Sequence, residues 1–116
     1  MKEKFYRNIF YYKNYYLDFF KTLQPEVKKK FNWTLQLIRD LKNVPVKFFK
    51  HMTGTSGLFE IRVEYGSNIY RVFSFFDEGN LVILINGFQK KTRKTPAKEI
   101  EKAEKLKKQY FDEKEK

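Results

Sequence analysis

The segment between Gly57 and Pro96 constrains the fold more than any other part of the chain. It contains three strand-like runs joined by short turns: Leu58–Tyr65, Ile69–Phe76 and Leu81–Phe88. The first run alternates apolar and charged residues, which is typical of a strand with one polar face. The second is nearly all apolar, as expected for a central strand covered on both faces. Glycine- and asparagine-containing turns separate the runs, so the segment predicts three consecutive antiparallel strands.

The N-terminal half adds one strand and two helices. Phe5–Tyr12 is rich in aromatic residues and predicts a first strand. Asn14 is the expected N-cap of a short helix over Tyr15–Leu23, and Pro25 fits the first position of a second helix. The apolar stripe of this second helix has helical spacing and consists of Val27, Phe31, Leu35, Ile38 and Leu41. The short connection between the helices predicts an antiparallel helical hairpin.

The rest of the chain completes an α+β fold. Val46–Gly57 is predicted to be a loop or a ragged extension, and Thr95 is expected to cap a final helix that begins at Pro96. The predicted order is strand, two-helix hairpin, three antiparallel strands and C-terminal helix, with the helices on one face of the sheet. A length of 116 residues predicts a single compact domain over residues 1–116.

Composition argues against several classes of protein. With no cysteine and one histidine, the chain has neither disulfides nor a typical transition-metal site, and no cofactor is expected. It has no glycine-rich phosphate loop and no sequence support for a hydrolase triad. No apolar run reaches the roughly 20 residues of a membrane helix, and the basic N-terminus lacks the features of a signal peptide. We therefore expect a cytoplasmic protein without a membrane partner.

The charge of the chain favours a polyanionic partner. Twenty-five basic residues against 14 acidic ones give a net charge of +11. Such an excess suits RNA, DNA, an acidic protein or an anionic membrane, although it also serves solubility. Composition alone does not choose among these.

Two arginines lie inside the predicted strands. Arg62 falls on the polar face of its strand, whereas Arg71 lies among apolar residues and needs a partner. One interpretation pairs Arg71 with Glu60 or Glu64 across the hairpin. The other places both arginines on an exposed sheet face, where planar guanidinium groups match phosphate oxygens. The two are compatible, because a carboxylate can orient an arginine that also contacts substrate.

A cluster of cations follows the last predicted strand directly and consists of Lys90, Lys91, Arg93 and Lys94. Such runs are usually solvated, but this one is joined to the arginine-bearing strands. Crowded cations lower one another's pKa, so one lysine is a candidate for proton transfer.

Further candidates precede and end the strands. Lys47 and Lys50 are candidate RNA-binding residues, and His51 is either a general base or a surface residue. Phe88 either stacks on a base or closes the core.

Three segments together resemble a known family: LFEIR, IYRVFSFFDEGNLVIL and NGFQKKTRKTPAKEIEKA. They are similar to the HigB-type branch of the RelE/HigB toxin superfamily, including its phage-derived members. The segment VPVKFFKHM and the helix pair fit as well, so the resemblance covers nearly the whole chain.

This resemblance implies the toxin of a type II toxin–antitoxin system. Such toxins are metal-independent endoribonucleases, or mRNA interferases, that enter the ribosome, cleave mRNA, inhibit translation and arrest growth. The implied partners are a cognate helix-turn-helix antitoxin, the ribosome and mRNA. By resemblance, Arg62, Arg71 and either Lys90 or Lys91 occupy the basic positions of the active site. His51 is a further catalytic candidate on its chemistry alone. Lys47, Lys50, Arg93, Lys94 and Phe88 would contact the RNA.

The chain also departs from the family pattern. Members of this branch often have histidine where this chain has Asn86, and many RelE relatives have a tyrosine near Thr95 and Pro96. The identity of the proton donor and acceptor therefore stays open. A non-catalytic, basic nucleic-acid-binding module is the alternative, and a scaffold protein for an acidic partner is a third possibility.

Overall fold

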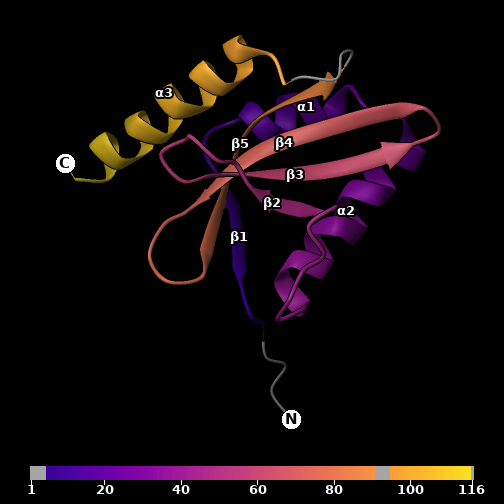
Figure 1. Ribbon diagram of the computed structural model, residues 1–116, viewed down its shortest axis with the longest axis horizontal. Coiled ribbons are helices and arrows are strands. Elements are labelled where there is room, and N and C mark those ends of the chain that lie inside the picture. Colours follow the sequence, from indigo (N-terminus) through magenta and orange to yellow (C-terminus); the bar gives the residue numbers. More distant parts are fainter. Residues whose placement is uncertain (1–4, 91–94, 116) are drawn as a thin grey trace.

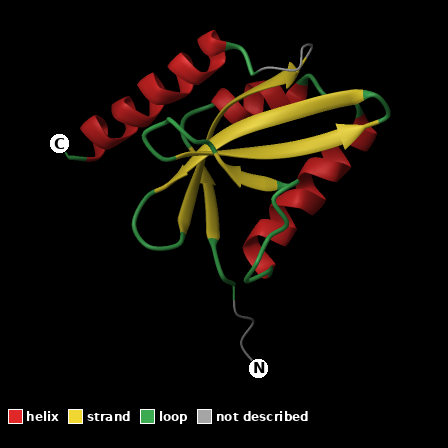
Figure 2. Cartoon of the chain, viewed as in Figure 1, coloured by secondary structure: helices red, strands yellow, loops and turns green. Residues whose placement is uncertain are grey.

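The computed structural model describes residues 5–90 and 95–115, which form an α+β fold with one five-stranded sheet in the order β1-β5-β4-β3-β2. Figure 1 shows the arrangement of its elements, and Figure 2 shows the strands in the middle with the helices outside them. The elements are β1 (Asn8–Tyr11), α1 (Tyr15–Lys21), α2 (Pro25–Asp40), β2 (Phe49–His51), β3 (Leu58–Tyr65), β4 (Asn68–Phe76), β5 (Leu81–Lys90) and α3 (Ala97–Lys114). Among the described residues, no helix is both long enough and apolar enough to cross a bilayer.

The centre of the sheet is the antiparallel arrangement of β3, β4 and β5 that the sequence predicts. Arg62 of β3 lies opposite Arg71 of β4, which in turn lies opposite Phe88 of β5. Because directly opposed residues project from the same face of a sheet, these three side chains share one face. The register shifts between Val72 and Ser74, where β5 has an extra residue relative to β4.

The two edge strands differ from expectation. The first strand pairs in parallel with β5. It is shorter than predicted, because the N–H groups of Tyr6 and Arg7 donate to the carbonyl of Arg39 and not to a neighbouring strand. The segment predicted as a loop contains β2, which pairs antiparallel with β3. Three residues are too few to show an alternating pattern, so this strand forms only by adding to the β3 edge.

The helices cover both faces of the sheet, so the prediction that they share one face is wrong. One apolar cluster joins α1 and α2 to the sheet and includes Tyr16, Val27, Phe31, Ile38, Ile61, Val72 and Leu84. A second cluster lies on the other face under α3 and includes Leu58, Phe73, Phe75, Ile85, Ala103 and Leu106. Strands β4 and β5 contribute to both clusters, which explains their nearly continuous apolar sequence. Figure 1 shows α3 apart from α1 and α2.

Gly87 allows α1 to approach the sheet closely. A Cβ atom at this position would lie 2.5 Å from the Phe19 ring, which is closer than any side chain tolerates. Phe19 packs edge-on against Phe31, with the ring centres 5.8 Å apart, and thereby links α1, α2 and β5. Packing therefore requires glycine at position 87, because the Phe19 ring of α1 occupies the space that a side chain would need.

The C-terminal helix is anchored at its far end by a buried carboxylate. Asp77, in the turn after β4, accepts hydrogen bonds from the Tyr110 hydroxyl at 2.5 Å and from the Lys114 ammonium at 2.8 and 3.0 Å. At its start the helix begins at Ala97 with Pro96 in the cap position, and no cap side chain donates or accepts a hydrogen bond there. The predicted capping by Thr95 is therefore wrong. Asn14 does occupy the N-cap position of α1 as predicted, but its side chain forms no capping hydrogen bond.

We expect Asp77→Asn to lower the free energy of unfolding by about 1–3 kcal/mol at pH 7, since hydrogen bonds to a charged group are removed. The Lys114 ammonium and then the Tyr110 hydroxyl hold the pKa of Asp77 below 3.8. A lowered folded-state pKa stabilises the protein above the unfolded-state value, and that contribution disappears as the pH falls through the folded-state value. The difference between the two proteins in urea denaturation should therefore shrink below about pH 3.8.

Asp112→Asn is the matched control, because within the described residues Asp112 pairs only with Lys108, in an exposed contact on the same helix. A loss of stability equal to that of Asp77→Asn, or a difference that does not depend on pH, would contradict the role of Asp77.

Candidate functional site

A cluster of charged side chains occupies the sheet face next to the part that α3 covers. Arg62 and Arg71 are adjacent across β3 and β4, with Glu60 two residues before Arg62 and on the same face. Lys50 of β2 lies opposite Glu60, so it belongs to this face as well. The predicted convergence of two arginines on one sheet face is thus present, and β2 adds a third cation at the edge.

Arg71 is held by a buried ion pair with Glu60. The side chain of Arg71 is 11% exposed and that of Glu60 is 7% exposed. This is one of the two pairings that the sequence left open for Arg71. A guanidinium has five N–H donors, and within the described part of the chain its buried Nε has no hydrogen-bond partner. The pair therefore fixes the orientation of Arg71 through one of its nitrogens, Nη1.

Arg62 pairs with a different carboxylate, that of Glu64 on the same strand. This pair is more open, because the Arg62 side chain is 33% exposed and that of Glu64 is 57% exposed. Such exposed pairs are worth little free energy, so a phosphate can replace Glu64 at small cost. The Nε of Arg62 is also buried and, among the described residues, lacks an acceptor.

Lys90 ends β5 and joins the same cluster. It lies two residues after Phe88, on the face of the sheet that carries the arginines, and is half-buried. Burial, followed by the positive charge of Arg71, lowers the pKa of Lys90. The carboxylate of Glu60 opposes this shift and the Arg62 guanidinium adds to it, so all three charges lie near the Lys90 ammonium.

The structure separates His51 from the other predicted site residues. His51 lies opposite Phe59, and the centres of the two rings are 5.2 Å apart. Phe59 packs against the apolar cluster under α1 and α2, so His51 belongs to the face opposite Arg71. Its neighbour Lys50 faces the cluster instead, because successive residues of a strand alternate.

The remaining predicted residues have three different positions. Phe88 is half-buried beside Arg71 and packs on Phe73 with the ring centres 5.5 Å apart, which favours the core over base stacking. Lys47 lies outside the sheet face, on a cavity next to α2. The other three predicted cations, Lys91, Arg93 and Lys94, lie outside the described residues.

Asn86, at the bulge of β5, is buried against α3. Its Nδ2 donates to the carbonyl oxygen and to Oε2 of Glu99, both at 3.2 Å. This pairing links β5 to the first turn of α3 and takes the amide out of the cation cluster. Asn86 therefore serves to attach β5 to α3.

Sequence reasoning missed a basic cavity between α2 and the edge of β3. Its volume is about 600 Å³, and β3 contributes Arg62 and Glu64 to its wall. From α2 come Lys29, Lys30 and Trp33, of which Trp33 is 51% exposed. Trp33 lies off the apolar stripe of its helix, and this exposed position in a polar context was the signal available in the sequence.

The clustered charges suit one kind of ligand. Arg62, Arg71, Lys90 and Lys50 outnumber the carboxylates of Glu60 and Glu64. Forked guanidinium donors and an ammonium group on a rigid sheet match the oxygens of a phosphodiester. Among the described residues, no group of three or more histidine, aspartate or glutamate side chains is placed to hold a metal ion.

Comparison with known families decides the membership of the chain. The model of the family described as Phage derived protein Gp49-like (DUF891) matches residues 18–108. The chain belongs to this Gp49-like family. No curated protein sequence matches it significantly.

Solved structures show the fold of this Gp49-like protein. A double arginine-to-alanine mutant of Escherichia coli toxin RelE, in the free state, matches with a TM-score of 0.60 and 16% identity, covering 87% of this chain and 96% of that one. The archaeal RelE–RelB complex from Pyrococcus horikoshii OT3 matches with a TM-score of 0.51 and 16% identity, covering 71% and 92%. These matches confirm the α+β fold predicted from the sequence and show that this fold is similar to that of RelE toxins.

Proposed function

We propose that this Gp49-like protein is the toxin of a type II toxin–antitoxin system and cleaves mRNA as a metal-independent endoribonuclease. The observation that carries the proposal is the cluster of Arg62, Arg71 and Lys90 on one face of the sheet. Membership of the Gp49-like family and the RelE fold support it. The archaeal relative was solved with RelB, which supports an antitoxin partner for this chain.

The proposed reaction uses the substrate's own nucleophile. The 2′-hydroxyl gives up its proton to a base and its oxygen attacks the adjacent phosphorus. The bond to the 5′-oxygen breaks as that oxygen takes up a proton, and the products are a 2′,3′-cyclic phosphate and a 5′-hydroxyl. The 2′-hydroxyl also makes the reaction selective for RNA over DNA. The protein needs only to align these groups, stabilise charge on the phosphorane and transfer protons.

Arg62 and Arg71 would stabilise the charge that develops on the phosphate oxygens. Both are carried by paired strands, and Glu60 fixes Arg71, so the donors are preorganised. Removing one such donor typically costs about 100–1,000-fold in rate. Lys90, whose pKa is lowered, would protonate the leaving 5′-oxygen. The ribosome would supply further alignment of the substrate, which is worth several powers of ten in suitable cases.

The test is the integrity of mRNA after induced expression in bacterial cells. We expect growth arrest, messages cut within their coding regions, and fragments ending in 2′,3′-cyclic phosphate and 5′-hydroxyl groups. Intact messages in arrested cells would indicate the non-catalytic binding module instead. Unimpaired growth with no association with ribosomes would contradict the toxin assignment as a whole.

A further inference from the structure

The cavity between α2 and β3 lies beside the charged cluster and shares Arg62 and Glu64 with it. Its wall combines Trp33 and Phe48 with the cations Lys29, Lys30, Lys47 and Arg62, against the single carboxylate of Glu64. Because Arg62 lines this cavity and also neighbours Arg71 across the sheet, the cavity and the cluster form one continuous surface.

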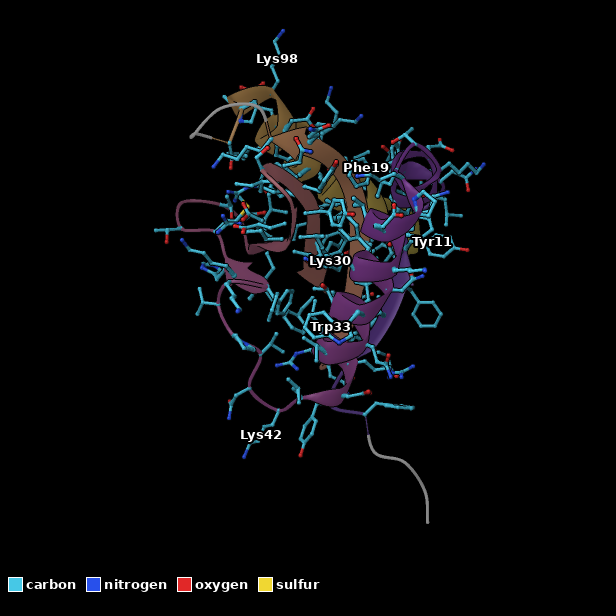
Figure 3. All side chains as sticks on the ribbon, turned by 90° about the vertical axis from the view of Figure 1, so that its right-hand side faces the viewer. Tyr11, Phe19, Lys30, Trp33, Lys42 and Lys98 are labelled. Atoms are coloured by element: carbon cyan, nitrogen blue, oxygen red, sulfur yellow. The ribbon has the colours of Figure 1, made fainter. Side chains whose placement is uncertain are left out.

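Two aromatic rings line the cavity, and that of Trp33 is open to solvent. Trp33 and Phe48 meet edge to face, with ring centres 5.4 Å apart, and the Lys47 ammonium lies 4.9 Å from the centre of the Phe48 ring. Although it contacts Phe48, Trp33 remains 51% exposed. Figure 3 shows Trp33 and Lys30 about one turn apart along α2. A large aromatic side chain kept half in water beside three lysines is suited to stacking on a nucleotide base.

The edge of β3 is closed to an added peptide strand. This edge extends beyond the end of β2, and an extended acidic peptide would be the other ligand suited to a basic cavity. The Lys30 ammonium, however, donates a 2.8 Å hydrogen bond to the carbonyl of Glu64 on that edge. A strand added here would have to displace this lysine, and lysines at sheet edges commonly prevent such pairing. The cavity therefore favours a nucleotide over a peptide.

We propose that the α2–β3 cavity binds a nucleotide of single-stranded RNA that flanks the cleaved linkage. Its base stacks on Trp33, its phosphate is bound by Lys29 and Lys47, and Arg62 connects this site to the scissile phosphate. The volume of about 600 Å³ falls within the range of small-ligand sites, which suits one nucleotide and not a duplex. This assignment rests on the proposed function, because it names where the same RNA continues.

Trp33 is the single tryptophan of the chain and therefore reports on its own site. We would titrate the purified protein with a 2′-O-methyl RNA hexanucleotide, which cannot undergo 2′-hydroxyl attack, and follow tryptophan fluorescence. Saturable quenching is the expected result. With the same oligonucleotide labelled at its 5′ end, fluorescence anisotropy should show that Trp33→Ala weakens binding about tenfold, whereas Trp33→Phe keeps most of the affinity.

The lysines are tested by the salt dependence of binding. The double variant Lys29→Ala/Lys47→Ala should reduce the slope of log affinity against log salt by about 0.7 for each phosphate that the protein no longer neutralises. Lys42→Ala is the matched control, because Lys42 is exposed and lies outside the cavity, and its slope should equal that of the unmodified protein.

Two results would overturn the assignment: unchanged RNA affinity in Trp33→Ala, or quenching of Trp33 by a hexaglutamate peptide but not by the RNA. The outcome is distinct from that of the nuclease test. Cleaved messages together with unchanged affinity in Trp33→Ala would reject the cavity alone. Tight, Trp33-dependent binding with intact messages would retain the cavity and reject the nuclease.

Discussion

Replacing Arg71 by alanine is expected to slow mRNA cleavage strongly and, separately, to destabilise the protein. The first effect should be about 100–1,000-fold, the usual cost of removing one donor that stabilises an oxyanion. The second follows from the ion pair with Glu60, whose side chain is 7% exposed. Without Arg71 that carboxylate is left buried and unpaired, which costs about 3–5 kcal/mol of stability. Loss of growth arrest in Arg71→Ala would therefore not distinguish slower cleavage from lower stability of the protein.

The double variant Glu60→Gln/Arg71→Gln separates the two effects. It removes both charges together, and the two amides can still hydrogen-bond across the strands, so most of the stability should return. Cleavage should not return, because the phosphate still lacks the Arg71 guanidinium. Urea denaturation measures the first quantity and in vivo mRNA fragmentation the second.

Arg39→Ala is the matched arginine control, since Arg39 forms a surface pair with Asp40. It should retain both stability and cleavage. Growth arrest at full strength in the stable double variant would remove Arg71 from the mechanism.

The central sheet was predictable because its information is local. Alternation along Leu58–Tyr65 and the two short turns fix β3, β4 and their pairing within a few residues. Once the register of that hairpin is set, Arg62 and Arg71 must project from the same face of the sheet, and Glu60 must project from that face as well. The convergence of the two arginines, and one of the partners offered for Arg71, therefore followed from the sequence.

The edges and layers were not predictable because they depend on contacts between distant segments. The face on which His51 lies is set by the register of β2 on β3, and three residues do not encode a register by themselves. The amphipathic helices α2 and α3 fit either face of the sheet equally well. Phe73 and Phe75 on one face and Val72 on the other did indicate that β4 is covered twice, which requires a helix on each side.

Substitutions of Lys90 test its role in proton transfer, the step for which the sequence did not identify the residues. Lys90→Met should lower cleavage about 100–1,000-fold by removing a cation beside the phosphate. Lys90→Arg keeps the cation, but a guanidinium stays protonated and releases no proton at neutral pH. Burial and the Arg71 guanidinium lower the pKa of Lys90, which brings it closer to the pH at which it would donate a proton.

If Lys90 protonates the leaving oxygen, Lys90→Arg should also be impaired, by about 100–10,000-fold. In the unmodified protein cleavage should then fall as the pH rises through the lowered pKa of Lys90, because the neutral amine cannot donate. That decline should be absent from the residual activity of Lys90→Arg. The measurement is the single-turnover cleavage rate on programmed ribosomes across alkaline pH, with Lys98→Arg on the exposed surface of α3 as the control. Full activity and an unchanged pH profile in Lys90→Arg would restrict Lys90 to charge stabilisation and assign the proton to another group.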